Sequence, residues 1–249
     1  MQHKLLASIC ALLFLAALAG CGDDDPALDW GKTVDYDAAV GERVLGTATA
    51  ALDGTNGRYQ ETVLGNFIMD GIAEYARFKS GGTVDFALHN GQNLKVFTLS
   101  GELNNAAILA LLGADKLYIC TYTGKQVKDI IEGFVKSTTA GSWNANCAVM
   151  VSKEVSYTIN TAGGPPEAAN IKVNGALVDE GKNYRVALGD FIGNNSNASR
   201  FFPVLPDDKK TSYDPTTLAQ AVAQYVMAKG TINPSDYPLG RYTGEVPVL

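Results

Sequence analysis

The chain has 249 residues, of which 46% are hydrophobic and 18% charged, a balance typical of a globular protein. Twenty-six acidic residues against 20 Lys and Arg give a formal net charge of −6. Nucleic-acid binding depends on neutralising phosphates with clustered Lys and Arg, and this acidic chain has no basic cluster. The composition therefore argues against a nucleic-acid-binding protein.

Histidine is scarce, because the chain holds only His3 and His89. Zinc sites with several His ligands, and two-metal phosphoesterase centres, need more histidines than this. A Ser-His-Asp triad would have to use His89, and no G-x-S-x-G motif is present to supply the serine. We therefore expect no metal site in this chain, and we expect His89 to be a half-buried polar residue that closes a strand.

The first predicted element in chain order is an export signal. The apolar run over residues 5–20 is too short for a membrane-spanning helix and is typical of a secretory signal. Its end, L-A-G-C at residues 18–21, resembles a bacterial lipobox, which predicts a lipoprotein signal peptide over 1–20 and lipidation of Cys21. The alternative is an ordinary secretory signal with an incidental cysteine. Several acyl chains on one residue anchor a protein stably to a membrane.

Gly22 after the lipidated residue favours the outer membrane or the cell surface as the location. Residues 21–42 are predicted to be an acidic tether, because the run GDDDPALDWGK at 22–32 is too polar to pack. The roughly 225 residues after the signal are enough for one domain with a good core. We place this domain at residues 43–249.

Hydrophobic periodicity and β-propensity predict the elements of the first half of the domain. Glycines at 65 and 71 weaken the first helix, which indicates close packing or function there. The predicted elements are a helix over 61–78, a strand over 83–89, a helix from the N-cap Asn104 to Gly113, a strand over 116–123 and an amphipathic helix over 124–136.

The second half of the chain is predicted to be mostly strands, over 147–159, 171–178 and 184–191. Asn174-Gly175 between apolar flanks indicates a two-residue hairpin turn. Asp214 as N-cap and Pro215 at the first position predict a helix over 216–230. This order of elements predicts the fold class α+β, as a single mixed domain.

Cys120 and Cys147 are the two cysteines that remain inside the predicted domain. In an exported chain such a pair is consistent with a disulfide. Two buried free thiols are equally consistent with the sequence. Both interpretations stay open at this point.

Several short motifs in this order resemble the C-terminal domain of the 5′-nucleotidase family. The resemblance begins near Arg43 and covers nearly all of the chain from there to its end. Each motif is weak by itself, but six in register are specific. The matching stretches are R-x-x-E-x-x-L-G-N at 58–66 followed by Asp70, the N-G of N-G-G-G-I-R at 90–95, G-E-L at 101–103, Y-T-G at 122–124, V-N-G at 173–175, and Y-R-V-A at 184–187 followed by Asp190 and Phe191.

The resemblance implies a substrate-recognition half whose catalytic partner is a metallophosphatase domain holding two divalent metals. No such domain is expected before residue 43, so we expect no cofactor in this chain and no catalysis by it alone. The family supplies arginines for the substrate phosphate, two aromatic rings for the base and an acidic group for the ribose. Carried over by position, the implied substrate-binding residues are Arg58, Asn90, Gly91, Lys95, Phe191 and Asn197.

The site also departs from the family pattern. Lys95 replaces an arginine and so loses its bidentate fork, and Asn197 stands where the family has aspartate. Residues 112–115 (LGAD) replace F-G-N, which removes the second ring, and Gln92 and Asn93 replace two glycines. One stacked ring is worth roughly 1–3 kcal/mol, so we expect the nucleotide affinity to be lowered by one or two orders of magnitude.

Three functions are compatible with this pattern. The first is a membrane-anchored, degenerate recognition module for a nucleotide or another phosphate ester, linked to nucleotide catabolism. The second is the same fold retained as a non-catalytic surface module that binds a protein partner. The third is an enzyme split over two chains, in which this lipoprotein recruits a separate metallophosphatase chain.

Overall fold

The computed structural model describes residues 28–32, 41–91, 94, 98–136, 147–194 and 205–246. The predicted signal peptide, the lipidation residue Cys21, and the site residues Lys95 and Asn197 lie outside these described residues. The boundaries 1–20, 21–42 and 43–249 therefore stay predictions. Among the helices that the structure describes, none has the length and apolar character needed to cross a membrane.

Helices and runs of consecutive strands are mixed along the described chain, in agreement with the predicted α+β fold class. The α-helices are α1 (Val63–Ser80), α2 (Asn105–Leu112), α3 (Gly124–Lys136), α4 (Asp190–Gly193) and α5 (Leu218–Lys229). The strands are β1 (Val44–Asp53), β2 (Phe86–Asn90), β3 (Thr98–Asn104), β4 (Lys116–Thr123), β5 (Val149–Val151), β6 (Val155–Asn160), β7 (Glu167–Val173), β8 (Ala176–Leu177), β9 (Asn183–Gly189), β10 (Lys210–Thr217), β11 (Thr231–Ile232) and β12 (Tyr242–Thr243).

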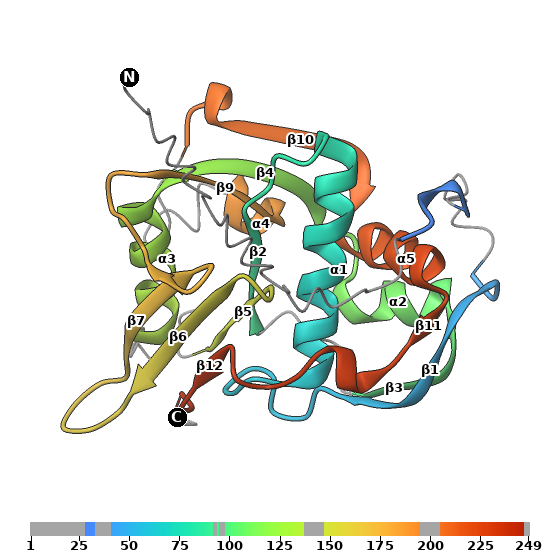
Figure 1. Cartoon of the computed structure of the whole chain (residues 1–249), viewed down its shortest axis with the longest axis horizontal. Helices are drawn as coiled ribbons and strands as arrows, with labels where there is room; N and C mark the ends of the chain where they lie inside the picture. Colours follow the sequence, from blue (N-terminus) through green and yellow to red (C-terminus); the bar gives the residue numbers. More distant parts are fainter. Residues whose placement is uncertain are drawn as a thin grey trace, which may run out of the picture.

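A five-stranded sheet in the order β10-β4-β9-β2-β5 forms the centre of the molecule. Two smaller sheets flank it, β11-β1-β3 beside α2 and α5, and β12-β6-β7-β8 beside α3 (Figure 1). Alternate residues of the central strands enter two different cores. In β4, Ile119 packs with the core of α1, α2 and α5, whereas Tyr122 packs with the core of α3 and β6. Helices and strands therefore cover both faces of this sheet.

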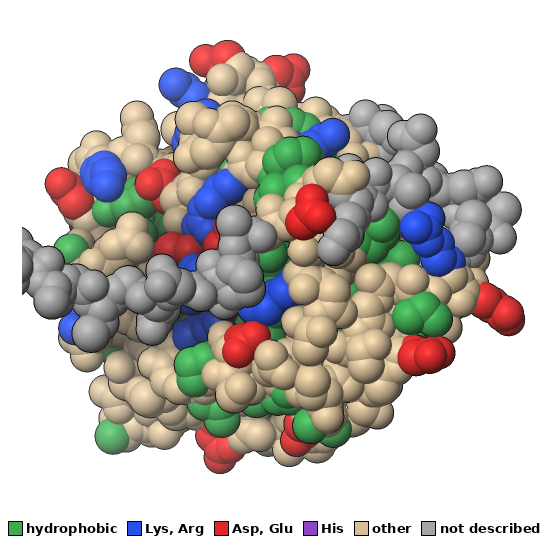
Figure 2. Space-filling model, turned by 45° about the vertical axis from the view of Figure 1, so that its right-hand side comes forward, with side chains coloured by type: hydrophobic (Ala, Val, Ile, Leu, Met, Phe, Trp, Pro, Cys, Tyr) green, Lys and Arg blue, Asp and Glu red, His purple; other side chains and the backbone are tan. Residues whose placement is uncertain are grey.

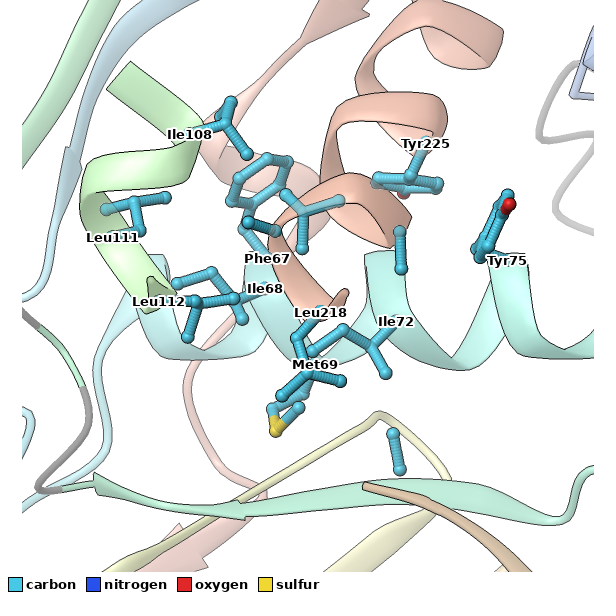
Figure 3. Packing of buried hydrophobic residues seen from close by; sticks show 14 of the residues in the cluster. Phe67, Ile68, Met69, Ile72, Tyr75, Ile108, Leu111, Leu112, Leu218 and Tyr225 are labelled. Atoms are coloured by element: carbon cyan, nitrogen blue, oxygen red, sulfur yellow. The ribbon is translucent and has the colours of Figure 1, made fainter. Parts of the chain in front are cut away.

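Helix α1 is the central helix of the larger core (Figure 3). Its N-cap is Thr62, whose hydroxyl accepts a hydrogen bond from the Gly65 N–H at 3.1 Å. A Cβ at Gly71 would lie 2.9 Å from the Tyr225 ring of α5, and one at Gly65 would lie 3.2 Å from the Met150 sulfur. Both glycines thus permit close packing, as their position in a helix indicated.

Several predicted elements are confirmed. The Asn104 side chain caps α2 by accepting from the Ala107 N–H at 2.8 Å, and Gly113 ends that helix. Asn174 and Gly175 have φ angles of 51° and 78°, as a two-residue hairpin turn between β7 and β8 requires. The segment 147–159 forms two strands rather than one, because a turn at Ser152 separates β5 from β6.

The prediction for the last helix is wrong at its start. Asp214 and Pro215 lie in β10, so neither opens a helix. The N-cap of α5 is Thr217, whose hydroxyl accepts from the Gln220 N–H at 3.1 Å while the Gln220 side chain accepts from the Thr217 N–H at 2.7 Å. This reciprocal capping box begins the helix three residues later than Asp214 suggested.

Both cysteines of the domain are buried thiols that form no disulfide, so the disulfide alternative is wrong. Cys120 lies in β4 and Cys147 immediately precedes β5. Three strand spacings separate β4 from β5 in the central sheet, roughly 14 Å, which is too far for a disulfide. Burial raises the pKa of the Cys120 thiol to about 12, as expected for an unreactive core cysteine.

The end of the acidic run is not solvated as predicted. Residues 28–32 contain a short 3-10 helix, Trp30–Lys32, that lies against the domain. The Trp30 ring stacks on Phe78 with ring centroids 4.7 Å apart and tilts against Tyr75 at 5.9 Å. Burial of apolar ring area of Trp30 against α1 stabilises this contact by more than the acidic neighbours gain from full solvation.

Candidate functional site

The predicted site residues that the structure describes lie where the inner strands β2 and β9 of the central sheet end. We call this end of the sheet the sheet edge. Strands β2 and β9 are parallel, with Ala87 opposite Ala187, so both end at the same edge. Asn90 is the last residue of β2, and Asp190 directly follows Gly189, the last residue of β9. The antiparallel strands β4 and β5 begin at the same edge. This sheet edge is therefore where four chain segments meet.

Arg58 and Gly91 are in contact at this edge. The N–H of Gly91 donates to the Ala148 carbonyl at 2.9 Å, and the N–H of Ala148 donates to the Arg58 carbonyl at 2.8 Å. A Cβ at Gly91 would collide with the Gly57 carbonyl and lie 3.2 Å from the Arg58 Cα. Only glycine permits this approach, which places the backbone of Arg58 beside the Asn90–Gly91 turn.

The Arg58 side chain is half-buried, with its guanidinium carbon 5.4 Å from the centre of the Tyr59 ring. This cation–π contact limits the orientations of the guanidinium. The phosphate role that the family resemblance implies for Arg58 stays a prediction.

Phe191 lies in α4, the single helical turn that follows β9. Its ring is partly buried against the core of α3 and β6, so part of the side chain stays accessible. Phe191 follows β9 on one side of β2, and the Arg58 carbonyl accepts from Ala148, which precedes β5 on the other side of β2.

A His-Asp-Asp cluster, made of His89, Asp115 and Asp190, lies at the same sheet edge. The Nε2 atom of His89 is 3.1 Å from Oδ2 of Asp115, and Asp115 also hydrogen-bonds the Asp190 side chain. His89 is fully buried, so the expectation of a half-buried residue is wrong. His89 can be buried because Asp115 supplies a hydrogen-bond partner for its ring in the interior.

The two carboxyl groups of this cluster have pKa values shifted in opposite directions. Burial and the neighbouring Asp115 carboxylate raise the pKa of Asp190 to about 6. For Asp115, hydrogen bonds from His89 and Asp190 outweigh the opposing effect of burial and lower the pKa to about 2. Asp115 is therefore the ionised partner near pH 5, and Asp190 carries the proton.

Much of the first family motif has a structural role. One carboxylate oxygen of Glu61 accepts from the Gly240 N–H at 2.8 Å, and the other accepts from the Arg241 N–H at 3.0 Å and from the Asn66 side chain at 2.8 Å. Asp70 binds the Arg241 guanidinium with both oxygens at 2.7 Å. These contacts hold the segment after α5 against α1, so these motif residues support the fold.

A cleft of about 770 Å³ lies elsewhere, between α1, α5 and the segment after α5. Trp30, Lys153 and Tyr225 contribute to its walls, and none of the predicted substrate-binding residues does. Its charged residues pair with one another, as Lys229 does with Asp236 at 3.0 Å. On the face drawn in Figure 2, acidic and basic side chains are interspersed and form no continuous basic patch among the described residues.

The structure brings Arg58, Asn90, Gly91 and Phe191 to one edge, and Lys95 and Asn197 lie outside the described residues. Sequence reasoning missed Asp115 as the partner of His89 and Asp190 as the partner of Asp115, because three distant segments supply the three residues. Within the described residues, no group of three or more His, Cys, Asp or Glu has the arrangement to hold a metal ion.

Comparison with known proteins gives one consistent result. Residues 44–206, more than half of the chain, match the family described as 5′-nucleotidase, C-terminal domain. The trifunctional nucleotide phosphoesterase protein YfkN of Bacillus subtilis (strain 168) is 28% identical over 157 residues, which cover 60% of this chain and 10% of that protein.

Solved structures show the same fold. The 5′-nucleotidase precursor from Thermus thermophilus superposes with a TM-score of 0.67 at 19% identity, over 82% of this chain and 40% of that chain. The NAD nucleotidase of Haemophilus influenzae (NadN) superposes with a TM-score of 0.65 at 15% identity, over 82% and 38%. The chain thus spans about two fifths of the length of these structures.

Proposed function

Because this chain belongs to the 5′-nucleotidase C-terminal domain family, we propose that it recognises a nucleotide or another phosphate ester. The ligand site is the sheet edge formed by Arg58, the Asn90–Gly91 turn and Phe191. Arg58 binds the phosphate, and Phe191 covers one face of the base. Lys95 and Asn197 follow from sequence position as further ligand contacts.

The contact between Arg58 and Gly91 is the observation that supports this proposal most. These residues are 33 positions apart, and the backbone of one occupies the space that a side chain on the other would need. A mere surface turn does not require such an approach. Gly91 is buried and its N–H donates to the Ala148 carbonyl, so what this contact offers an anion is the charge of Arg58 and not free backbone.

The proposed affinity is weak. Leu112 stands where the second ring of the family would lie, so only Phe191 stacks on the base. Loss of one stacked ring costs roughly 1–3 kcal/mol, or about one to two orders of magnitude in the dissociation constant. Such a weak affinity is sufficient for a module that works beside a partner, because the partner raises the local concentration of the ligand.

We further propose that the chain is a lipoprotein anchored through Cys21, at the outer membrane or cell surface. The L-A-G-C sequence at 18–21 after the apolar run supports this proposal. When cells are fed a tagged fatty acid, wild-type protein should take up label and the Cys21→Ser variant should remain unprocessed and unlabelled. Label retained by the variant would contradict the lipobox interpretation.

A separately encoded metallophosphatase chain is the proposed partner. The relatives extend well beyond the region matched here, and this chain matches only 40% of the Thermus thermophilus structure. In this arrangement the anchored module holds the nucleotide and the partner supplies two divalent metals for hydrolysis, in a pathway of nucleotide catabolism. Co-purification of a metallophosphatase with the tagged lipoprotein would support this arrangement.

Calorimetry with AMP, adenosine and inorganic phosphate tests the proposed site. Charge-assisted contacts to phosphate are worth roughly 1.5–3 kcal/mol, so Arg58→Ala should weaken AMP binding about ten- to a hundredfold. Phe191→Ala should weaken AMP and adenosine similarly and leave phosphate unchanged. Arg185→Ala is the matched control, because Arg185 lies near the start of β9, at the opposite edge of the same sheet.

Two results would overturn the proposal. One is a wild-type protein that binds none of the three ligands below the millimolar range. The other is an Arg58→Ala variant whose affinity for AMP equals that of the wild type. Either result would favour the alternative function, a surface module that binds a protein partner with a retained but inactive fold.

A further inference from the structure

Helix α4 has no capping side chain of its own. Its N-cap is Gly189, and the Phe191 N–H in the first turn needs an acceptor. Oδ1 of Asp115 accepts this hydrogen bond at 3.3 Å, although Asp115 is 76 residues away in the chain. A Cβ at Gly189 would collide with the Asp115 carboxylate. Asp115 thus occupies the place of the N-cap side chain, from the segment before β4.

His89 holds this carboxylate in place from the other side. The Nδ1 atom of His89 accepts a hydrogen bond from the Asn90 N–H at 2.9 Å. The neutral ring therefore carries its proton on Nε2 and donates it to Oδ2 of Asp115 at 3.1 Å. A continuous series of hydrogen bonds links Asn90, His89, Asp115 and Phe191.

We propose that Asp115, held by His89, is a positioning residue that sets the Phe191 ring and couples it to the Asn90–Gly91 turn. The proposal rests on the proposed function for its ligand. Asp115 touches no part of a nucleotide in this arrangement and acts through the backbone of α4. The phosphate end and the base end of the site are then one cooperative unit, because the same hydrogen bonds order both.

The hydrogen-bonded series from Asn90 to Phe191 depends on pH, because Asp115 and Asp190 share one proton. The ionisable groups that face Asp115 are His89 from β2 and Asp190 from α4, with Lys116 of β4 beside Asp190. Oδ1 of Asp190 accepts from the Lys116 N–H at 3.3 Å, and the protonated Asp190 donates to Asp115. Once Asp190 ionises, two carboxylates are in contact and repel each other.

The direction of the pH effect follows from these pKa values. The pKa of Asp190 is raised to about 6, so its stabilising contribution is complete below the ordinary value of 3.8 and lost as pH rises through 6. The pKa of Asp115 is lowered to about 2, so its contribution is present above 3.8 and lost as pH falls towards 2. The shared proton therefore holds the unit together up to about pH 6.

Two measurements on the full chain test this proposal. The first follows the backbone amide resonance of Phe191 from pH 4.5 to 8 by NMR. The wild type should show a titration with a midpoint near pH 6, and Asp190→Asn should abolish it, because the amide keeps a donor for Asp115 without an ionisation. Asp129→Asn, an exposed position of α3, is the control and should titrate as the wild type does.

The second measurement is the affinity for adenosine at pH 5.5 and 7.5. Adenosine is the probe because the second ionisation of a phosphate near pH 6 would overlap with that of Asp190. Wild-type affinity should fall about three- to tenfold between the two pH values, and Asp190→Asn should bind equally at both. Asp115→Asn should weaken adenosine binding at both pH values.

The outcomes separate this proposal from the proposed function. A Phe191 amide that does not titrate near pH 6, or that titrates equally in Asp190→Asn, would overturn the positioning role. A titrating amide together with adenosine affinity independent of pH would also overturn it. Absence of AMP and adenosine binding at every pH would instead overturn the proposed function, and with it the ligand role of Asp115, even where the amide titrates.

Discussion

At the residue scale, the ion pair between Arg241 and Asp70 has the largest predicted effect on stability. Both side chains are only 7% exposed, and two hydrogen bonds of 2.7 Å join them. The Arg241 guanidinium also donates to the Val151 carbonyl at 3.0 Å. Burial raises the pKa of Asp70 although the arginine opposes this shift. Each of the two side chains is therefore a buried charge that depends on the other for its stabilisation.

Arg241→Ala should lower the free energy of unfolding by about 3–5 kcal/mol at pH 7, because the Asp70 carboxylate is left buried without its counter-charge. Without the arginine the pKa of Asp70 rises further, so protonation removes the charge and the deficit should shrink at pH 4.5. Urea denaturation at both pH values measures these differences. Lys125→Ala, which breaks an exposed pair with Asp129, should leave the stability almost unchanged. Equal effects of the two variants would contradict this account.

Some residue roles follow from the sequence and others do not. The family pattern implied that Arg58 and Gly91 serve one site, and their backbone contact was seen only in the structure. The Asp115 partner of His89 was not predicted, since nothing local links a loop residue to a strand residue 26 positions away. Electrostatic partners across strands become visible only when the strand order is known.

At the element scale, the start of α5 shows which signal decides a helix boundary. Asp214-Pro215 is a frequent pair at helix starts, yet both residues lie in β10, where Ser212 pairs with Tyr118 of β4. The Thr217–Gln220 capping box satisfies the backbone at the actual start. Pairing with β4 outweighs the local preference of Asp214-Pro215 for a helix start, because β10 is the outermost strand on that side of the central sheet.

Thr217→Ala should cost about 1 kcal/mol of stability, as loss of an N-cap side chain does. Asp214→Ala is the matched control and should cost much less, because Thr217, and not Asp214, is the N-cap. Thermal unfolding by circular dichroism compares the two variants directly. A larger loss for Asp214→Ala than for Thr217→Ala would return the helix start to the position that the sequence alone suggested.

Elements with a strong periodic pattern were predictable, and strands without one were not. Helix α3 was predicted with its bounds because its buried residues, such as Val127 and Phe134, repeat at helical spacing. Strand β1 was missed because its Ala, Gly and Thr residues are mostly exposed and show no alternation. Its partners β3 and β11 come from distant segments, so pairing rather than local sequence forms this strand.

At the scale of the whole molecule, the proposed site predicts recognition without catalysis. Purified protein should release no phosphate from AMP, ATP or UDP-glucose above background with Mn²⁺, Co²⁺ or Zn²⁺. Only two histidines occur in the chain, and no described group of side chains has the arrangement to hold a metal. Metal-dependent turnover that scales with protein and survives repurification would refute this prediction.

The central claim is that the sheet edge, and not the cleft, is the ligand site. It is tested most directly by titrating AMP into ¹⁵N-labelled protein and mapping the amide shifts. We expect the largest shifts at Arg58, Asn90, Gly91 and Phe191, with the amides that line the cleft unchanged. Shifts confined to the cleft, or no shifts at millimolar AMP, would contradict the claim.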